Sequence, residues 1–326
     1  MIITVTPNPS IDRTAALSTP LIRGEVQRTG AVTTEPGGKG VNVARALTLA
    51  GLDSLAVLPA AQHDPILAGL EAQRVRYLAV PATNAVRTNL TLTESDGTTT
   101  KINEPGNPID TATVEALTAA VLERAAAADW VILSGSLPPG MDDNWYSQLV
   151  ERLLPLGCKI AVDTSDAPLA ALAAGFDRAA PHLIKPNSEE LAHLAGVCPG
   201  DLEIALNRNE PAPVVDAAYT LIARGARAVL ATLGASGAVL VDETGAWAAV
   251  PAPMVPRSTV GAGDSALAGY VRADLDGADA AHRLQMAVAY GSAAAALPGS
   301  AIPSPTQIDM GAVTVSRFHS VPNLGG

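Results

Sequence analysis

Cysteine, lysine, aromatic residues and long apolar runs are all scarce in this chain of 326 residues. The two cysteines, Cys158 and Cys198, show no disulfide or metal-binding spacing, as is usual in a reducing cytosol. No apolar run approaches the roughly 20 residues of a membrane span, and no signal segment precedes the first strand-like run. We therefore expect a soluble, cytoplasmic protein.

Positive charge is scarce as well. The chain has 21 lysines and arginines against 32 aspartates and glutamates, a net charge of −11. Nucleic acid and anionic membranes would be repelled, so neither is an expected partner. An anionic ligand would need a local positive site, for which the lysines available are Lys39, Lys101, Lys159 and Lys185. Aromatics make up 3% of the residues, so alanine, valine and leucine must fill the core.

Strand-like runs alternate with helical patterns along most of the chain. Strands are expected at 2–6, 55–58, 77–80, 130–133, 159–162, 183–184 and 228–232. Helices are expected at 65–74, 111–128, 143–154, 189–195 (capped by Ser188) and 214–224. This order predicts an α/β fold with a mainly parallel central sheet sandwiched by helices. The chain lacks repeats, linkers and charge blocks, so we expect a single domain over 1–326.

Two segments depart from this alternation. Residues 87–93 alternate in polarity, turn at 95–97 and return through 98–102, which predicts a hairpin with one polar face. Residues 15–35 are threonine-rich and broken, which favours short exposed strands. Together they predict a small sheet standing off the main one.

The stretch Ser258–Ala268 places glycines and an acid before a helical pattern. Gly261 and Gly263 allow close approach of backbone to a ligand, and a helix starting near Asp264 would present free amides to an anion. The alternative is that Asp264 is an ordinary helix N-cap. The apolar face of this helix is expected to carry Leu267, Tyr270, Val271 and Leu275.

A dinucleotide site is excluded at this stretch. Gly261-x-Gly263-x-x-Ala266 fits the fingerprint, but the fingerprint belongs to the first βα turn of its unit. Here it follows a proline-broken run at 250–256, near the end of the chain.

A second glycine motif precedes the helical pattern that begins near residue 41. Gly37, Gly38, Lys39 and Asn42 are typical of a site for a polyhydroxy or anionic ligand; a bare turn with a solvated lysine is the alternative. The motif is not a Walker A loop, because no serine or threonine follows the lysine. Asp12 lies just beyond the first strand, where ligands bind in open α/β sheets, although it could be a turn residue.

The glycine motifs at 37–45 and 258–265, in this order and separation, resemble those of the ribokinase-like carbohydrate kinases of the PfkB family, and the resemblance runs from end to end. Segments 6–12, 101–106 and 135–140 are similar to the phosphosugar branch. That branch contains 1-phosphofructokinase, tagatose-6-phosphate kinase and the minor 6-phosphofructokinase. A lysine at the position of Lys39 resembles the glycine motif of the first two enzymes.

The resemblance implies ATP-dependent, Mg²⁺-assisted phosphorylation of a sugar phosphate. It favours conversion of fructose 1-phosphate to fructose 1,6-bisphosphate, with tagatose 6-phosphate or fructose 6-phosphate as alternative acceptors. It also implies a small β lid over about 13–35 and 86–104, and it allows a homodimer through that lid. A non-catalytic sugar-phosphate sensor is the alternative from another class, disfavoured because a sensor has no use for a base at Asp264.

The resemblance further assigns roles to individual residues. The catalytic base is Asp264, and the anion hole is formed by the amides of Gly261, Ala262 and Gly263. The sugar phosphate is held by Asp12, Gly37, Gly38, Lys39, Asn42, Arg87 and Asn89. ATP is held by Lys185, Asn187, Thr232, Gly234, Ser236, Gly237 and Gly291. Glu190 is expected to hold Mg²⁺ through water.

Overall fold

A computed structural model describes residues 1–208 and 210–318, so the end of the predicted 1–326 domain lies outside the described residues. Within them, one sheet has the strand order β14-β13-β12-β11-β10-β9-β8-β1-β4-β5. Its parallel strands are β1 (Ile2–Val5), β4 (Ser54–Ala60), β5 (Tyr77–Pro81), β8 (Trp130–Ser134), β9 (Lys159–Asp163), β10 (Leu183–Ile184) and β11 (Ala228–Thr232). Antiparallel pairings add β12 (Ala238–Asp242), β13 (Gly245–Pro251) and β14 (Val313–Phe318).

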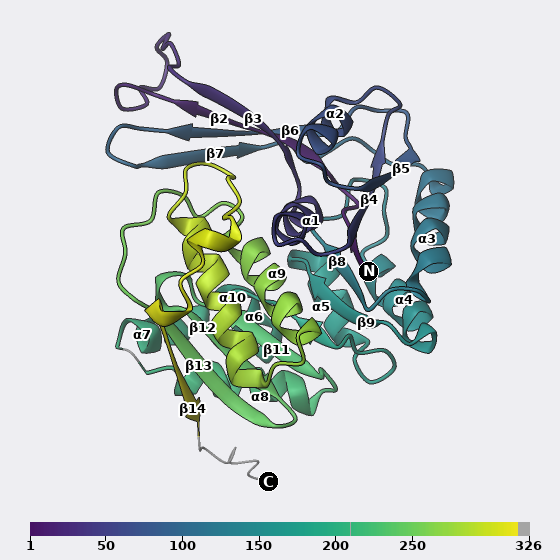
Figure 1. The fold of residues 1–326 in the computed structure, drawn as a ribbon, viewed down its shortest axis with the longest axis vertical. Helices are drawn as coiled ribbons and strands as arrows, with labels where there is room; N and C mark the ends of the chain where they lie inside the picture. The colour runs from purple at the N-terminus through teal and green to yellow at the C-terminus, as the bar shows by residue number, and fades with distance from the viewer. Residues whose placement is uncertain (209, 319–326) are drawn as a thin grey trace.

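Helices cover both faces of this sheet (Figure 1). One face is covered by α1 (Lys39–Leu49), α9 (Ala262–Leu275) and α10 (Ala280–Ala295). The other face is covered by α3 (Thr111–Ala125), α4 (Trp145–Leu153), α5 (Asp166–Ala174), α6 (Ser188–Ala195) and α8 (Ala212–Ala223). The remaining α2 (Pro65–Ala72) contacts the second sheet, and α7 (Pro199–Asn207) packs on α6 and α8. The predicted α/β architecture is confirmed.

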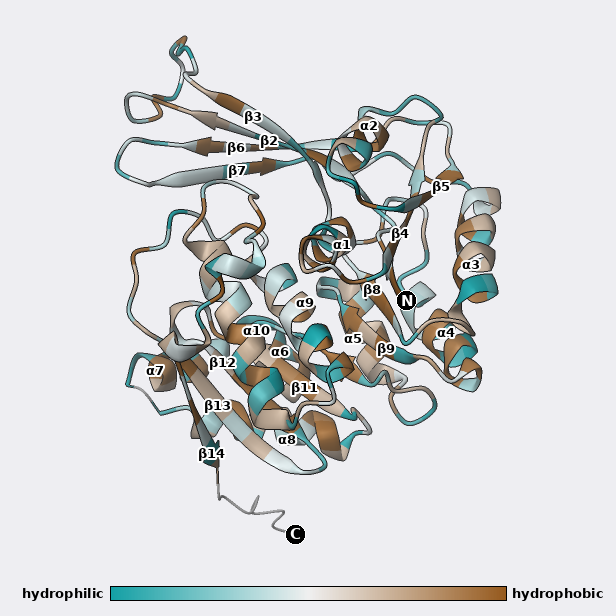
Figure 2. Ribbon diagram, in the orientation of Figure 1, coloured by the Kyte–Doolittle hydropathy of each residue, from teal (hydrophilic) through white to brown (hydrophobic). Residues whose placement is uncertain are grey.

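The strands of the central sheet are apolar because both of their faces are buried (Figure 2). In β1, Ile2 packs into the core under α1 and α9, whereas Ile3 and Val5 pack into the core under α3 and α4. Alternation of side chains along a strand therefore feeds two cores at once. Among the described residues, no helix is both long and apolar enough to cross a membrane.

A second, four-stranded sheet stands off the first (Figure 1) and is called the outer sheet below. It contains, in spatial order, β3 (Val32–Gly37), β2 (Ser10–Ala16), β6 (Arg87–Thr93) and β7 (Thr99–Asn103). The predicted hairpin is present as β6 and β7, paired antiparallel. Since Ser10 lies opposite Arg87 and Asp12 opposite Asn89, these four side chains share one polar face.

Several local predictions were wrong. The N-cap of α6 is Asn187 and not Ser188, because the Asn187 side chain accepts a hydrogen bond from the Glu190 amide. Leu275, expected on the buried face of α9, is exposed at the helix end. The sequence reading did not identify α5, α7, α10 or β12–β14, and β13 extends into the run at 250–256 that was read as broken by prolines.

Candidate active site

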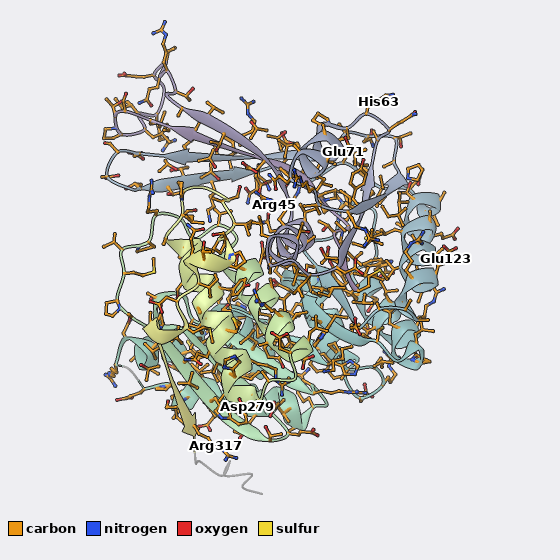
Figure 3. The ribbon with its side chains drawn as sticks, viewed as in Figure 1. Arg45, His63, Glu71, Glu123, Asp279 and Arg317 are labelled. Atoms are coloured by element: carbon orange, nitrogen blue, oxygen red, sulfur yellow. The ribbon has the colours of Figure 1, made fainter. Side chains whose placement is uncertain are left out.

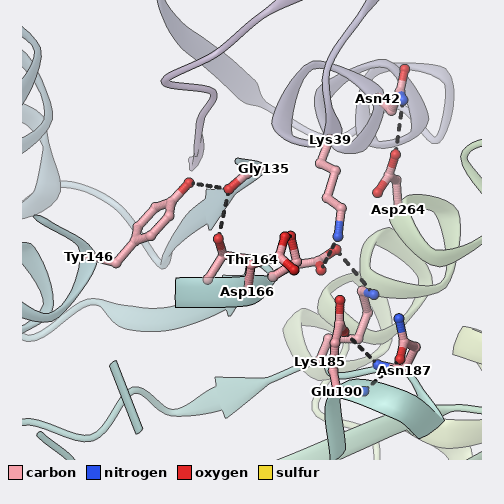
Figure 4. Close-up of polar contacts among 12 residues, drawn as sticks. Lys39, Asn42, Gly135, Tyr146, Thr164, Asp166, Lys185, Asn187, Glu190 and Asp264 are labelled. Atoms are coloured by element: carbon pink, nitrogen blue, oxygen red, sulfur yellow. Dashed lines mark hydrogen bonds and ion pairs between the residues drawn. The ribbon is translucent and has the colours of Figure 1, made fainter. Parts of the chain in front are cut away.

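The predicted site residues converge where the parallel strands of the central sheet end. Strand β9 ends at Asp163, and Lys185 follows β10 directly. Lys39 Nζ lies 2.8 Å from Asp163 Oδ1, and Lys185 Nζ lies 3.1 Å from Asp163 Oδ2 (Figure 4). One carboxylate thus positions two of the few lysines of the chain.

Charge balance keeps this cluster ionised around the buried Asp163. Burial disfavours the charged Lys39 ammonium, but Asp163, Asp264 and Glu190 together outweigh burial, so the pKa of Lys39 is raised. Burial also opposes ionisation of Asp163, which is fully buried, yet Lys185 and Lys39 hold its pKa below the usual range. The two lysines exceed the single acid by one positive charge.

Asp264 lies in the first turn of α9, facing α1. Its carboxylate Oδ2 accepts a hydrogen bond of 2.9 Å from Asn42 Nδ2. The helix begins at Ala262 with Gly261 as N-cap, and among the described residues no side chain caps it. The alternative interpretation of Asp264 as an ordinary N-cap is therefore wrong, because its side chain bonds to another helix.

Burial, and after it the nearby Asp163 carboxylate, raise the pKa of Asp264 to about 6. Lys39, the Asn42 amide and Lys185 act in the opposite direction by favouring the ionised form. A carboxylate with a pKa just below neutrality is suited to act as a general base at pH 7.

The amides beside Asp264 are the candidate anion site. Ser265 donates the first i to i−4 hydrogen bond of α9, to the Gly261 carbonyl at 2.8 Å, which leaves the preceding amides without partners inside the helix. Gly261 has φ of 76°, a left-handed conformation that favours glycine. A β-carbon on residue 263 would lie 3.1 Å from Lys185 Nζ, so an ammonium group lies beside the same amides. Helix dipole and lysine both favour an anion here.

The polar face of the outer sheet carries groups whose chemistry suits hydroxyl binding. Asp12 Oδ1 accepts hydrogen bonds from Ser10 Oγ at 2.7 Å and Asn89 Nδ2 at 3.0 Å. A β-carbon on residue 37 would overlap the Asp12 carboxyl group, so any larger residue there would displace that carboxyl group. Asn89 Oδ1 is buried and has no hydrogen-bond partner among the described residues, which leaves an acceptor suited to a sugar hydroxyl.

Arg87 lies on the same face, with its side chain directed to the chain after β7. Its Nη1 donates to the Glu104 carbonyl at 2.9 Å, and Nε is buried without a partner among the described residues. Burial lowers the pKa of Arg87, and the Asp12 carboxylate opposes this. Arg87 and Lys39 are therefore held by different anchors, Glu104 and Asp163.

The residues predicted to bind the nucleotide gather near Lys185, around the ends of β10 and β11. Asn187 and Glu190 form a reciprocal capping box at the start of α6, with both hydrogen bonds at 2.8 Å. Asn187 also forms a β-bridge with Thr232, which brings in the glycine turn after β11. That turn contains Gly234, Ser236 and Gly237. Gly291 packs against the first turns of α9, where its absent side chain lets α10 approach the Ala262 carbonyl.

Sequence patterns did not assign a role to three residues that lie at the candidate site. The first is Asp163, although a carboxylate closing a buried parallel strand is itself a signal. Asn8 donates to Ser136 Oγ at 3.2 Å and joins the ends of β1 and β8. Arg45 accompanies Asn42 on α1.

The loop after β8 is held in place at the Gly135 carbonyl. This carbonyl accepts hydrogen bonds from the hydroxyl groups of Tyr146 and Thr164 (Figure 4).

Comparison with known proteins agrees with this geometry. Residues 6–307 match the pfkB family carbohydrate kinase. A 1-phosphofructokinase of Xanthomonas campestris pv. campestris is 35% identical over 85% of each chain, and the ATP-dependent 6-phosphofructokinase isozyme 2 of Escherichia coli is 35% identical over 90% of this chain and 92% of its own. The crystal structure of Escherichia coli phosphofructokinase-2 with substrates and products has a TM-score of 0.84 at 30% identity, covering 94% of this chain and 96% of that one. The chain belongs to the pfkB family of carbohydrate kinases.

Proposed function

We propose that this chain transfers the terminal phosphoryl group of ATP to a sugar phosphate, with fructose 1-phosphate as acceptor and fructose 1,6-bisphosphate as product. The observation that carries the proposal is the buried Asp264 carboxylate, with a pKa of about 6, beside the first-turn amides of α9 and two lysines. Relatives named 1-phosphofructokinase support this acceptor. The relative named 6-phosphofructokinase supports fructose 6-phosphate as the alternative, and tagatose 6-phosphate remains the other alternative.

In this mechanism Asp264 accepts the proton of the attacking hydroxyl group. Asn42 holds the carboxylate in place while the hydroxyl approaches. Asp12 and Asn89 orient the other hydroxyl groups of the sugar, and Gly37 and Gly38 let the backbone come close to it. Orientation of this kind removes much of the entropic cost of bringing two reactants together.

Negative charge on the transferred group is stabilised by groups that are already in position. The amides of Gly261, Ala262 and Gly263 lie at the start of α9, and Lys185 lies beside Gly263. Lys39 adds a second cation on the α1 side. Phosphoryl transfer depends mainly on positioning and charge stabilisation, so this arrangement is suited to it.

Mg²⁺ is expected to enter with ATP, where it neutralises phosphate charge. Among the described residues, no group of three or more histidine, cysteine or acidic side chains could hold a metal ion. Mg²⁺ does not need such a group, because it is commonly held by substrate phosphates, waters and one carboxylate. Glu190, whose pKa is raised by burial, is our candidate for that carboxylate, acting through water.

We place ATP between α6 and the turn after β11. Asn187 and Thr232 are joined by a β-bridge at the mouth of this region, and Lys185 separates it from Asp264. The short turn containing Gly234, Ser236 and Gly237 offers backbone amides and little side-chain bulk. Gly291 is assigned to the adenine end.

An acceptor assay tests the proposed function directly. The purified protein is incubated with ATP and Mg²⁺ and one of fructose 1-phosphate, fructose 6-phosphate or tagatose 6-phosphate, and ADP is measured. We expect the highest kcat/KM with fructose 1-phosphate. ATP turnover that none of the three sugar phosphates stimulates would support the sensor alternative and overturn the proposal.

We expect Arg87→Ala to raise KM for the sugar phosphate about 10- to 150-fold, because a charge-assisted hydrogen bond is worth roughly 1.5–3 kcal/mol. The unpartnered Nε of Arg87 leaves the guanidinium able to bind phosphate without breaking its bond to Glu104. KM for ATP is expected to change little. Steady-state kinetics in both substrates measures the two effects separately.

Arg28→Ala is the matched control, because Arg28 is an exposed arginine in the loop between β2 and β3 of the same sheet. It should leave both KM values unchanged. Equal weakening of both substrates by Arg87→Ala would point to misfolding or impaired closure, and an unchanged sugar-phosphate KM would remove Arg87 from the site.

We further propose that the outer sheet closes over the sugar as a lid and dimerises through its other face. The polar face carries Asp12 and Asn89, whereas the strand register places Val32 and Ile102 on the opposite face. These two side chains are 43% and 55% exposed, and an interface over them would remove their apolar surface from water. A structure of Escherichia coli phosphofructokinase-2 is described as a tetrameric inhibited form, which supports self-association in the family.

The mass in solution is expected to be twice the chain mass of 33.1 kDa. Ile102→Glu should return it to the monomer value, because the interface would then bury an unpaired charge. Light scattering after size-exclusion chromatography measures both. Ile204→Glu, at a 52% exposed position on α7, is the control. A dimer that survives Ile102→Glu would argue against the outer sheet as interface.

We assign the protein to the cytoplasm. Cys158 is buried and Cys198 exposed, and both are free thiols. An exposed free thiol fits a reducing compartment.

A further inference from the structure

One arginine connects the proposed base to the outer sheet. Arg45 lies on α1, one turn after Asn42, at the place where α1 meets the outer sheet (Figure 3). Its side chain is only 5% exposed, although it carries a full charge. Nη1 donates to Asn42 Oδ1 at 3.1 Å, and Nη2 forms an ion pair of 2.8 Å with Glu35 of β3. A buried arginine with this many partners is held in one rotamer.

The remaining contacts of Arg45 come from β3 again and from two other segments. Nε donates to Gln73 Oε1 at 2.6 Å, just after α2. Nη1 also lies 3.2 Å from the Pro36 carbonyl and 3.3 Å from the Ser300 carbonyl. Gln73 in turn donates to Glu35, which closes a ring of hydrogen bonds around the guanidinium.

The chemistry of the neighbours dictates how the Asn42 amide is turned. A guanidinium can only donate hydrogen bonds, and an ionised carboxylate can only accept them. An amide placed between the two has one orientation that satisfies both, with Oδ1 toward Arg45 and NH₂ toward Asp264. The structure has this orientation, with Asn42 Nδ2 2.9 Å from Asp264 Oδ2. Without Arg45, the amide could turn its oxygen toward the carboxylate.

We propose that Arg45 is a positioning residue for phosphoryl transfer: it fixes the Asn42 amide so that Asn42 holds Asp264 ionised and aimed at the acceptor hydroxyl. This inference rests on the proposed function, in which Asp264 is the base. It also makes the base dependent on the outer sheet, because Glu35 and the Pro36 carbonyl of β3 hold the same guanidinium.

A pH profile distinguishes this role from simple packing. The charged groups that face Asp264 are Lys39 and Arg45 from α1, Asp163 from β9 and Lys185 after β10. In Arg45→Met all but Arg45 remain. We expect the acidic limb of kcat/KM, near pH 6 in the wild type, to move up by about one pH unit, which lowers kcat/KM about tenfold on that limb. Arg45→Lys keeps a cation and a donor, and should recover part of the shift.

A double-mutant cycle tests whether Arg45 acts through Asn42. Asn42→Ala alone should move the acidic limb of kcat/KM to higher pH. Adding Arg45→Met should then change the position of the limb little. Additive shifts would overturn the inference, since Arg45 would then act independently of the amide. A wild-type profile in Arg45→Met, with only a lower urea midpoint, would also overturn it by showing a merely structural role.

Two controls keep the result interpretable. Arg76→Met removes an exposed arginine paired with Asp53, and should leave the profile unchanged. If Arg45→Met does not fold, the Arg45→Lys profile decides, with an unshifted limb counting against the inference.

Failure of this inference is distinguishable from failure of the proposed function. An Asp264→Asn enzyme that stays active would show that the proposed function has failed. An inactive Asp264→Asn enzyme, together with an unshifted pH profile in the Arg45 variants, would show that only this inference has failed.

Discussion

Asp264→Asn should lower kcat about 10²- to 10⁴-fold, the usual effect of removing a general base. Asparagine has nearly the same shape and keeps an oxygen that can accept from Asn42 Nδ2, so the acceptor hydroxyl should still bind. KM for both substrates is therefore expected to change little. Steady-state kinetics with fructose 1-phosphate and ATP measures both constants.

The stability of the same variant should move in the opposite direction to its activity. The pKa of Asp264 is raised from its ordinary 3.8 to about 6 in the folded chain, so the folded state binds more protons than the unfolded state between these values. The stability associated with the protonated acid is present below pH 3.8 and is lost as pH rises through 6. A neutral asparagine avoids that loss and should raise the free energy of unfolding at pH 8 by up to about 3 kcal/mol.

This pairing makes the result hard to explain by misfolding. Asp276→Asn, at the exposed end of the same helix, is the matched control and should change neither property much. In the wild type, kcat/KM should fall below about pH 6 as Asp264 becomes protonated. An Asp264→Asn enzyme with kcat within a few-fold of the wild type would falsify the assignment of the base.

The sequence predicted the architecture well wherever its signals were local. Buried strands such as Trp130–Ser134 are continuous apolar runs, and the hairpin of β6 and β7 alternates in polarity, so periodicity identified both. At the end of the sheet, β12 and β13 form a hairpin of neighbouring segments and were missed although their pairing is local, whereas β14 pairs with β13, which ends more than 60 residues earlier. Local patterns do not encode such a pairing.

The same distinction explains which site residues could be predicted. Glycine motifs at helix starts are local features, so the surroundings of Lys39 and Asp264 were identified from the sequence. The role of Asp163 depends on two lysines that are brought to it from α1 and from the end of β10. The helix cap at Asn187 and not at Ser188 shows the limit even of local signals, because both residue types are good caps.

Asp163 is where the second large effect is expected. Its carboxylate is fully buried and lies between Lys39 and Lys185. Asp163→Asn keeps the shape but leaves two ammonium groups without their counter-charge, one of them only 6% exposed. Removing one partner of a buried ion pair costs about 3–5 kcal/mol, because the remaining charge stays desolvated. We expect a loss of that size in the free energy of urea unfolding at pH 8.

Ligands should reverse part of this loss, because phosphate oxygens can replace the missing carboxylate beside the lysines. Saturating ATP or sugar phosphate is therefore expected to raise the urea midpoint more in Asp163→Asn than in the wild type. Asp143→Asn, an exposed acid before α4, is the control and should lose almost no stability. If the ligands raise the urea midpoint equally in the variant and the wild type, the two lysines do not bind the phosphate groups.

The pH profile gives Asp163→Asn a signature that general destabilisation lacks. The Asp163 carboxylate raises the pKa of Asp264, so its removal should lower that pKa and move the acidic limb of kcat/KM below pH 6. Arg45→Met should move the same limb upward, because it weakens the support of the ionised base. kcat should still fall in Asp163→Asn, since Lys39 and Lys185 are no longer held beside the anion site. A limb that stays at pH 6 in Asp163→Asn would mean that the two carboxylates do not share one electrostatic environment.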